Sequence, residues 1–147
     1  MTDLAAAQAH LVAALTGTGT VPPGFSPSRV EIARKALLRK RCGEIAKNWP
    51  VTAALLGERF GAEFARWAAA RPTQGSVRDG WNFLADLAAR GQLPAPARLE
   101  LADRRLQWRH RPGDHPHRRR LPAARIVQGR LLIQIGGRVR AFPSERA

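Results

Sequence analysis

The chain has 147 residues, of which 25 are lysine or arginine and 11 are aspartate or glutamate, so its formal net charge is +14. Hydrophobic residues make up 44% and charged residues 24%, which argues against intrinsic disorder and predicts one domain with at most a small appendage. The apolar runs fall well short of the roughly 20 residues that span a bilayer, the N-terminus lacks the basic start of a secretory signal, and the single cysteine excludes a disulfide framework. We therefore expect a cytoplasmic protein.

The positive charge is concentrated in the C-terminal third. Residues 1–103 carry 13 basic and 9 acidic side chains, whereas residues 104–147 carry 12 basic and 2 acidic ones. A tract with this excess of cations favours an anionic partner.

The first 108 residues have the spacing and punctuation of five to six helices. Asp3 is expected to cap a short first helix, and residues 17–25, rich in glycine and proline, form a loop after it. Ser26 and Pro27 then begin a long second helix, with serine as the N-cap and proline in the first turn.

The second helix ends near Asn48 and has one apolar and one basic face. The apolar side carries Val30, Ala33, Leu37, Leu38, Cys42 and Ile45, and the basic side carries Arg34, Lys35, Arg39, Lys40, Arg41 and Lys47. Because no histidine shares the apolar face, we expect Cys42 to be a buried, unreactive thiol.

The later helices are predicted from apolar residues that recur at three- and four-residue spacing. Ser76 is the expected N-cap and Gly91 the expected C-cap of one of them. The predicted buried residues are Val51, Ala54 and Leu55 in 50–56, Phe60, Phe64, Trp67 and Ala68 in 58–71, Val77, Trp81, Leu84 and Leu87 in 76–90, and Leu99, Leu101, Ala102 and Leu106 in a last helix that ends near Trp108.

The pattern changes after Trp108. Residues 109–122 are interpreted as an exposed basic linker, and residues 123–143 contain three short β-branched runs separated by two hairpin signals, Gln128-Gly129 and Gly136-Gly137. We predict a mainly α protein: a helical bundle over residues 1–108, the linker, and a small three-stranded antiparallel β-meander that leans on the bundle or on a partner.

The predicted meander has edge strands that can accept an extended peptide as an added strand. Arg125, Arg138 and Arg140 lie in these strands and suit an acidic peptide. Charges on edge strands also prevent aggregation, and the sequence leaves both interpretations open.

The basic residues also make nucleic acid a candidate ligand. The candidate contacts are Arg34, Lys35, Arg39, Lys40 and Arg41 on the second helix and Arg118, Arg119 and Arg120 in the linker. The basic tract holds no aromatic residue for base stacking, and no short recognition helix follows at helix-turn-helix spacing. We therefore expect duplex DNA binding to be weak and indifferent to sequence.

Signatures of catalysis are scarce, since the sequence holds no glycine-rich phosphate loop, no Gly-x-Ser-x-Gly elbow and no His-Glu-x-x-His pair. His110, His115 and His117, with Asp114 among them, are candidate metal ligands, but the arginines around them favour a solvated basic segment. The sequence predicts no catalytic residue, no metal site and no cofactor.

Residues 28–108 carry a pattern that resembles a known bacterial family. The matching stretches are Ala36 to Arg41, Trp49-Pro50, Leu55 to Phe60, Phe64, Arg71-Pro72 and Gly75 to Trp81. The chain resembles the actinobacterial branch of a helical family that is labelled as a DNA-binding domain. It is similar to the partner subunits of multinuclear iron oxidases that modify ribosomally made peptides, such as the methanobactin-making enzyme.

The resemblance implies a helical N-terminal part and a smaller β-rich part that helps to capture a precursor peptide. It also implies a non-catalytic adaptor role beside an iron-dependent catalytic subunit. The alternative, which the basic surface and the family label favour, is a DNA-binding regulatory protein.

Overall fold

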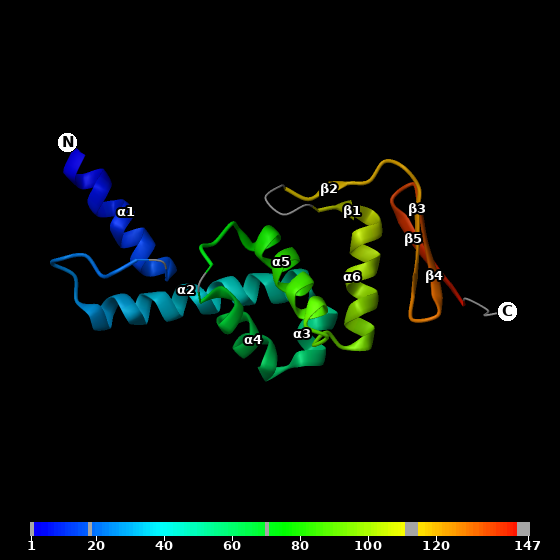
Figure 1. The fold of residues 1–147 in the computed structure, drawn as a ribbon, viewed down its shortest axis with the longest axis horizontal. Coiled ribbons are helices and arrows are strands. Elements are labelled where there is room, and N and C mark those ends of the chain that lie inside the picture. Colours follow the sequence, from blue (N-terminus) through cyan, green and yellow to red (C-terminus); the bar gives the residue numbers. More distant parts are fainter. Residues whose placement is uncertain (1, 18, 70, 111–114, 144–147) are drawn as a thin grey trace.

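A computed structural model describes residues 2–17, 19–69, 71–110 and 115–143. Over these residues, six helices precede a three-stranded antiparallel sheet, so the predicted mainly α fold with a β-meander is confirmed (Figure 1). The helices are α1 Thr2–Thr16, α2 Pro27–Asn48, α3 Pro50–Leu56, α4 Glu58–Ala68, α5 Ser76–Ala89 and α6 Ala95–Gln107. The strands are β1 Trp108–Arg109, β2 His117–Arg118, β3 Ala123–Val127, β4 Arg130–Ile135 and β5 Arg138–Pro143.

Helices α2 to α6 enclose a core with aromatic rings at its centre. Phe64 of α4 and Phe83 of α5 are fully buried, and their rings meet edge to face with 5.4 Å between centroids. The four residues predicted to face the core from α4 are all buried. In α5 the prediction holds for Trp81 but is wrong for Val77, which is exposed in the first turn.

The short helix α3 buries a different face from the predicted one. Its buried residues are Thr52 and Leu56, whereas Val51 and Leu55 are exposed. Thr52 donates from its backbone nitrogen (2.8 Å) and its Oγ1 (2.6 Å) to the carboxylate of Glu100 on α6. A polar contact to another helix thus orients α3, because in seven residues the spacing of apolar side chains is too short a pattern to decide which face is buried.

Several boundaries also differ from the predicted ones. Helix α4 ends at Ala68 and not at Arg71, the N-cap of α5 is Gly75 and not Ser76, and Trp108 already belongs to β1. Gly75 has φ of +93°, a conformation that L side chains rarely adopt.

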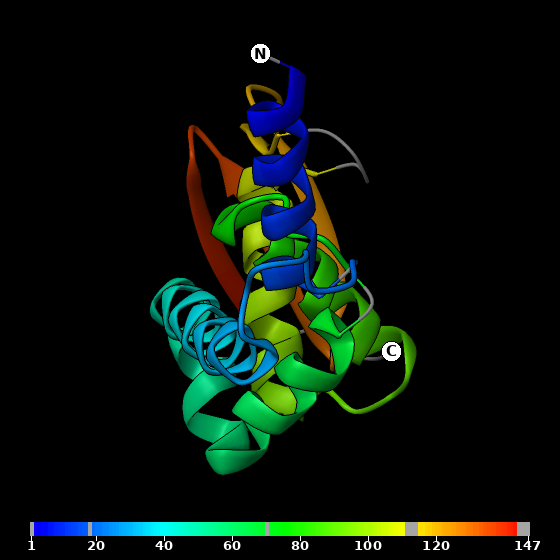
Figure 2. The same ribbon diagram turned by 90° about the vertical axis from the view of Figure 1, so that its left-hand side faces the viewer.

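Helix α1 stands apart from the core and contacts mainly α2 (Figures 1 and 2). Its side chains Leu4 and Val12 are exposed, while Ala14 is buried near its end, and Val30 of α2 is buried as well. No helix in the described part of the chain combines the length and the apolar character needed to cross a membrane.

The segment expected to be an exposed linker, residues 109–122, contributes to a two-stranded ribbon. Strands β1 and β2 pair antiparallel, with Trp108 opposite Arg118. Arg119 donates from its backbone nitrogen to the carbonyl of Gln107 (2.8 Å) and from Nε to the carbonyl of Arg105 (3.1 Å). The ribbon is therefore fastened to the end of α6.

Two tight turns build the meander, in the order β3-β4-β5. Gln128 and Gly129 have φ of 53° and 69°, and Gly136 and Gly137 have φ of 59° and 79°. Positive φ at both central positions is typical of two-residue hairpin turns, so both predicted hairpins are confirmed.

The inner face of the meander covers α6 (Figure 1). Leu132 of the central strand is buried with Ala102 and Leu106 of α6, and Val127 and Val139 pack around them. A three-stranded sheet needs a second layer for stability, and α6 provides it, as the sequence predicts.

Candidate anion-binding cleft

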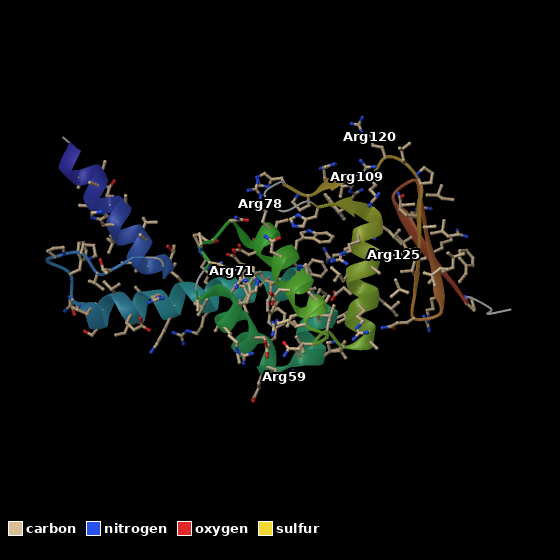
Figure 3. The ribbon with its side chains drawn as sticks, viewed as in Figure 1. Arg59, Arg71, Arg78, Arg109, Arg120 and Arg125 are labelled. Carbon is tan, nitrogen blue, oxygen red and sulfur yellow. The ribbon has the colours of Figure 1, made fainter. Side chains whose placement is uncertain are left out.

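The sheet separates the three arginines that were predicted to bind a peptide. Arg125 in edge strand β3 pairs with Leu132, so its side chain shares the inner face that covers α6, and Figure 3 shows it between α6 and the sheet. Arg138 and Arg140 lie in the other edge strand, β5, where Arg140 pairs with Ile133 on the outer face. Arg125 therefore lies on the opposite edge and the opposite face of the sheet from Arg138 and Arg140.

Arg125 lines a cleft of about 570 Å³ between α5, α6 and β3. We call it the arginine cleft, because Arg105 of α6, Arg119 after β2 and Arg125 all contribute to its wall. In the part of the chain that the structure describes, none of its lining residues is aspartate or glutamate. A hollow lined by three arginines, with no carboxylate among its described neighbours, suits an anionic ligand.

The positive charges of the arginines in the cleft repel one another. Burial lowers the pKa of the Arg105 guanidinium, and the charge of Arg125 lowers it further. Arg119 is held in place by the bond from its Nε to the Arg105 carbonyl. A bound carboxylate would offset this repulsion and accept charge-assisted hydrogen bonds from the same groups.

Aromatic rings form the wall of the cleft next to the ribbon. His110 stacks on Trp81 with 5.4 Å between ring centroids and a 21° interplanar angle, and its Nε2 lies 3.0 Å from Oδ1 of Asn82. The guanidinium of Arg118 lies 5.3 Å above the ring of Trp108. These contacts make the wall rigid.

The histidines do not gather around a common point. His110 stacks on Trp81, whereas His115 and His117 are exposed, and Asp114 lies outside the described residues. Within the described ranges, no group of three or more His, Cys, Asp and Glu side chains is placed to hold a metal ion.

The predicted basic face of α2 is divided by the fold, because Arg41 turns inward. Asp79 of α5 accepts hydrogen bonds from Nη2 (3.0 Å) and Nε (3.2 Å) of Arg41, whose guanidinium also lies 5.5 Å above the ring of Phe64. Arg41 is thus held toward α5 by the buried carboxylate of Asp79.

Arg34, Lys35 and Lys40 line a groove of about 530 Å³ between α1, α2 and α4, together with Arg41. Arg34 and Lys35 each approach Glu31 to 3.7 Å, which offsets part of their charge. Arg39 and Lys40 are exposed. Arg120, two residues after β2, is exposed as well (Figure 3).

Arg105, which lines the arginine cleft with Arg119 and Arg125, is not among the residues predicted from the sequence. The same holds for the neighbouring Arg104 and, at the start of α5, Arg78. The signal was present in the sequence, since Arg104 and Arg105 stand together shortly before Trp108.

The fold and the cleft define a small helical domain that carries a β-meander and an arginine-lined hollow between the two. The chain belongs to the family described as SCO6045-like, C-terminal domain, whose pattern matches residues 5–89, from within α1 to the end of α5. It is also similar to a UPF0276 protein of Streptomyces avermitilis, with 37% identity over 135 residues. The aligned region is 89% of this chain but 27% of that protein, so the chain spans about a quarter of the length of this relative. No solved structure matches the chain.

Proposed function

We propose that the protein is a non-catalytic adaptor that binds a precursor peptide and docks onto the larger, catalytic subunit of a multinuclear iron-dependent peptide-modifying enzyme. The arginine cleft beside the open edge of β3 carries the proposal. The enzyme class comes from the family resemblance of residues 28–108. A larger companion is supported by the Streptomyces avermitilis relative, of which the region similar to this chain makes up 27%.

The peptide would bind along β3. In the described sheet β3 pairs with β4 alone, so its other edge is available for an added strand. Alternate residues of an added strand point to the same face, so acidic residues at every second position would face Arg105, Arg119 and Arg125. Backbone hydrogen bonds would supply affinity, and the guanidinium groups would select for carboxylates.

The outer face of the sheet would dock onto the larger subunit. Ile126, Leu131 and Phe142 form one row across the three strands, and Ile133 and Ile135 continue the apolar surface. Arg138 and Arg140 flank it on β5. An exposed apolar patch with a charged rim is typical of protein–protein interfaces.

Peptide binding is tested with a labelled peptide of alternating glutamate and valine. A control peptide, the glutamine twin, has glutamine in place of every glutamate. We expect the acidic peptide to bind at physiological salt, and we expect Arg125→Gln to weaken binding about tenfold, as the loss of one charge-assisted hydrogen bond would. Fluorescence anisotropy measures the affinity.

The matched control is Arg140→Gln, which changes the same residue type in the same sheet but on the opposite edge and face. This variant should bind the acidic peptide as the unchanged protein does. Equal losses for both variants, or equal binding of the glutamine twin, would contradict a peptide site at the arginine cleft.

A further inference from the structure

A second cavity, of about 560 Å³, adjoins the arginine cleft. We call it the tryptophan pocket, because Trp49, Trp81 and Trp108 line it together with Arg78 and Arg104. It opens between the start of α5, the end of α6 and the residues before β2, and the described residues that line it include no aspartate or glutamate. Trp81 and Trp108 also line the arginine cleft, so the two hollows share a wall.

Arg78 has a hydrogen-bond donor that the protein itself does not use. Its Nε is buried and has no hydrogen-bond partner among the described residues. A buried donor without an acceptor is costly, and a guanidinium group matches the two oxygens of a carboxylate. Arg78 lines the pocket, so a carboxylate bound there would meet its guanidinium group.

Arg104 supplies a second cation at a fixed position. Its guanidinium lies 4.7 Å above the ring of Trp49, and its Nη2 donates to the carbonyl of Asn48. Both contacts restrain the side chain. A ligand would therefore meet a guanidinium group whose orientation is already set, which reduces the entropy lost on binding.

The indole rings form an apolar wall and are poorly suited to stack on nucleobases. Trp49 and Trp81 are buried and meet edge to face at 5.1 Å with an 89° interplanar angle. Arg104 covers Trp49, His110 stacks on Trp81, and Arg118 covers Trp108. Single-strand binding proteins use open aromatic faces, so these rings favour an apolar side chain over a base.

We propose that the tryptophan pocket binds a carboxylate that stands next to an apolar side chain, with Arg78 as its main hydrogen-bond donor and the indoles around the apolar group. The inference rests on the proposed peptide-binding function and deepens it, because the shared wall lets one peptide continue from the arginine cleft into this pocket. The carboxylate has two sources: the C-terminus of a peptide, or an acidic side chain beside an apolar residue.

The test uses the full chain and the indole N–H signals of its tryptophans in heteronuclear NMR. The probes are N-acetyl-phenylalanine for a C-terminal carboxylate and N-acetyl-phenylalanyl-glutamate amide for an acidic side chain. N-acetyl-phenylalaninamide is the neutral twin, and inorganic phosphate tests for a simple anion site. Trp67 packs against Phe64 and Phe83 in the core and is the internal control.

We expect one acidic probe to shift the signals of Trp49 and Trp81 while Trp67 stays unchanged, and the stronger of the two identifies the source. The neutral twin should bind about tenfold more weakly, since it lacks the charge-assisted bond. Equal binding of the neutral twin or of phosphate, or the absence of shifts with both acidic probes, would overturn the proposal.

Variants at Arg78 locate the site. Arg78→Gln should weaken the acidic probe about tenfold, and Arg78→Lys, which keeps the charge but loses the planar fork, should weaken it less. Arg59→Gln is the matched control, because Arg59 is exposed on α4, far from the pocket (Figure 3). If Arg59→Gln lost as much affinity for the acidic probe as Arg78→Gln, the assignment of the site to Arg78 would be overturned. If a variant fails to fold, the comparison of the acidic with the neutral probe on the unchanged protein still tests the proposal.

The two proposals fail separately. If peptide binding depends on Arg125 but does not shift the Trp49 signal, the proposed function stands and the proposal for the tryptophan pocket is overturned. Probe binding that depends on Arg78, with no peptide binding at Arg125, would retain the pocket and overturn the peptide site on β3.

Discussion

The ion pair of Arg41 and Asp79 ties α2 to α5. Asp79 is 1% exposed and also accepts hydrogen bonds from Thr73 Oγ1 (2.8 Å) and from the backbone nitrogen of Gln74 (3.1 Å). Asp79→Ala would leave the guanidinium of Arg41 half-buried without a counter-ion. Because loss of one partner of a buried pair costs about 3–5 kcal/mol, we expect the free energy of unfolding in urea to fall by about 3 kcal/mol.

Arg39→Ala is the control for this prediction, since Arg39 is an exposed arginine of the same helix. Its effect should stay within about 0.5 kcal/mol. If Asp79→Ala were as mild as Arg39→Ala, the buried pair would not be a stabilising contact.

Cys42 lies half-buried on α2, and burial raises the pKa of its thiol. A raised pKa lowers the thiolate fraction at any pH below it, and the thiolate is the reactive form. We expect Cys42 in the folded protein to react with iodoacetamide near neutral pH more slowly than free glutathione does. In urea the rate should rise to that of an unstructured thiol, and a fast reaction in the folded state would contradict the burial argument.

The outer face of the meander is the element through which docking is expected. Ile126 is 67%, Ile135 is 65% and Phe142 is 44% exposed, although all three belong to ordered strands. Burial of such side chains in an interface is worth about 1.5–3 kcal/mol each, so Phe142→Glu should weaken docking at least tenfold. Calorimetry with the remaining part of the Streptomyces avermitilis relative, expressed as a separate chain, measures the effect.

Leu121→Glu is the matched control, because Leu121 is 70% exposed but lies before β3 and outside the sheet. It should leave docking unchanged, and circular dichroism should show that both variants keep the fold. Docking that survives Phe142→Glu would assign the interface to another surface.

The net charge of +14 attracts the protein to DNA. The fold, however, already uses part of this charge within the protein, so we expect no tight complex. Arg41 pairs with Asp79, Arg34 and Lys35 share Glu31, and Arg119 donates to the carbonyl of Arg105, so four of the eight predicted contacts already have an ion pair or hydrogen bond within the protein. Six phosphate contacts would cost on the order of a thousandfold in affinity between about 50 and 200 mM salt.

We therefore expect duplex binding that is weak, indifferent to sequence and lost near physiological salt, in a gel-shift or anisotropy titration. Replacement of Arg39, Lys40 and Arg120 by alanine should remove the residual binding while the melting temperature stays unchanged. A sequence-selective complex that survives about 150 mM salt would favour the DNA-binding alternative over the adaptor.

Much of the architecture can be predicted from residues close together in the chain. The spacing of Phe60, Phe64 and Trp67 defines the buried face of α4, and glycines at positive φ define both hairpin turns. These features depend on local backbone geometry, so sequence patterns express them directly. The buried face of the short helix α3 and the pairing of β1 with β2 escaped prediction, because contacts between residues far apart in the chain decide both: the bond from Thr52 to Glu100 and the bridge between Trp108 and Arg118.

The amino-acid sequence alone determined the order of the elements, the basic character of the C-terminal third and the presence of arginines in the edge strands. Only the tertiary structure decided which arginines meet: Arg125 joins Arg105 and Arg119, while Arg41 turns to Asp79. The physical reason is that a strand sends alternate side chains to opposite faces, and its register against a neighbour decides which face meets the helices. Packing between distant segments therefore selects, from many similar cations, the few that line one cleft.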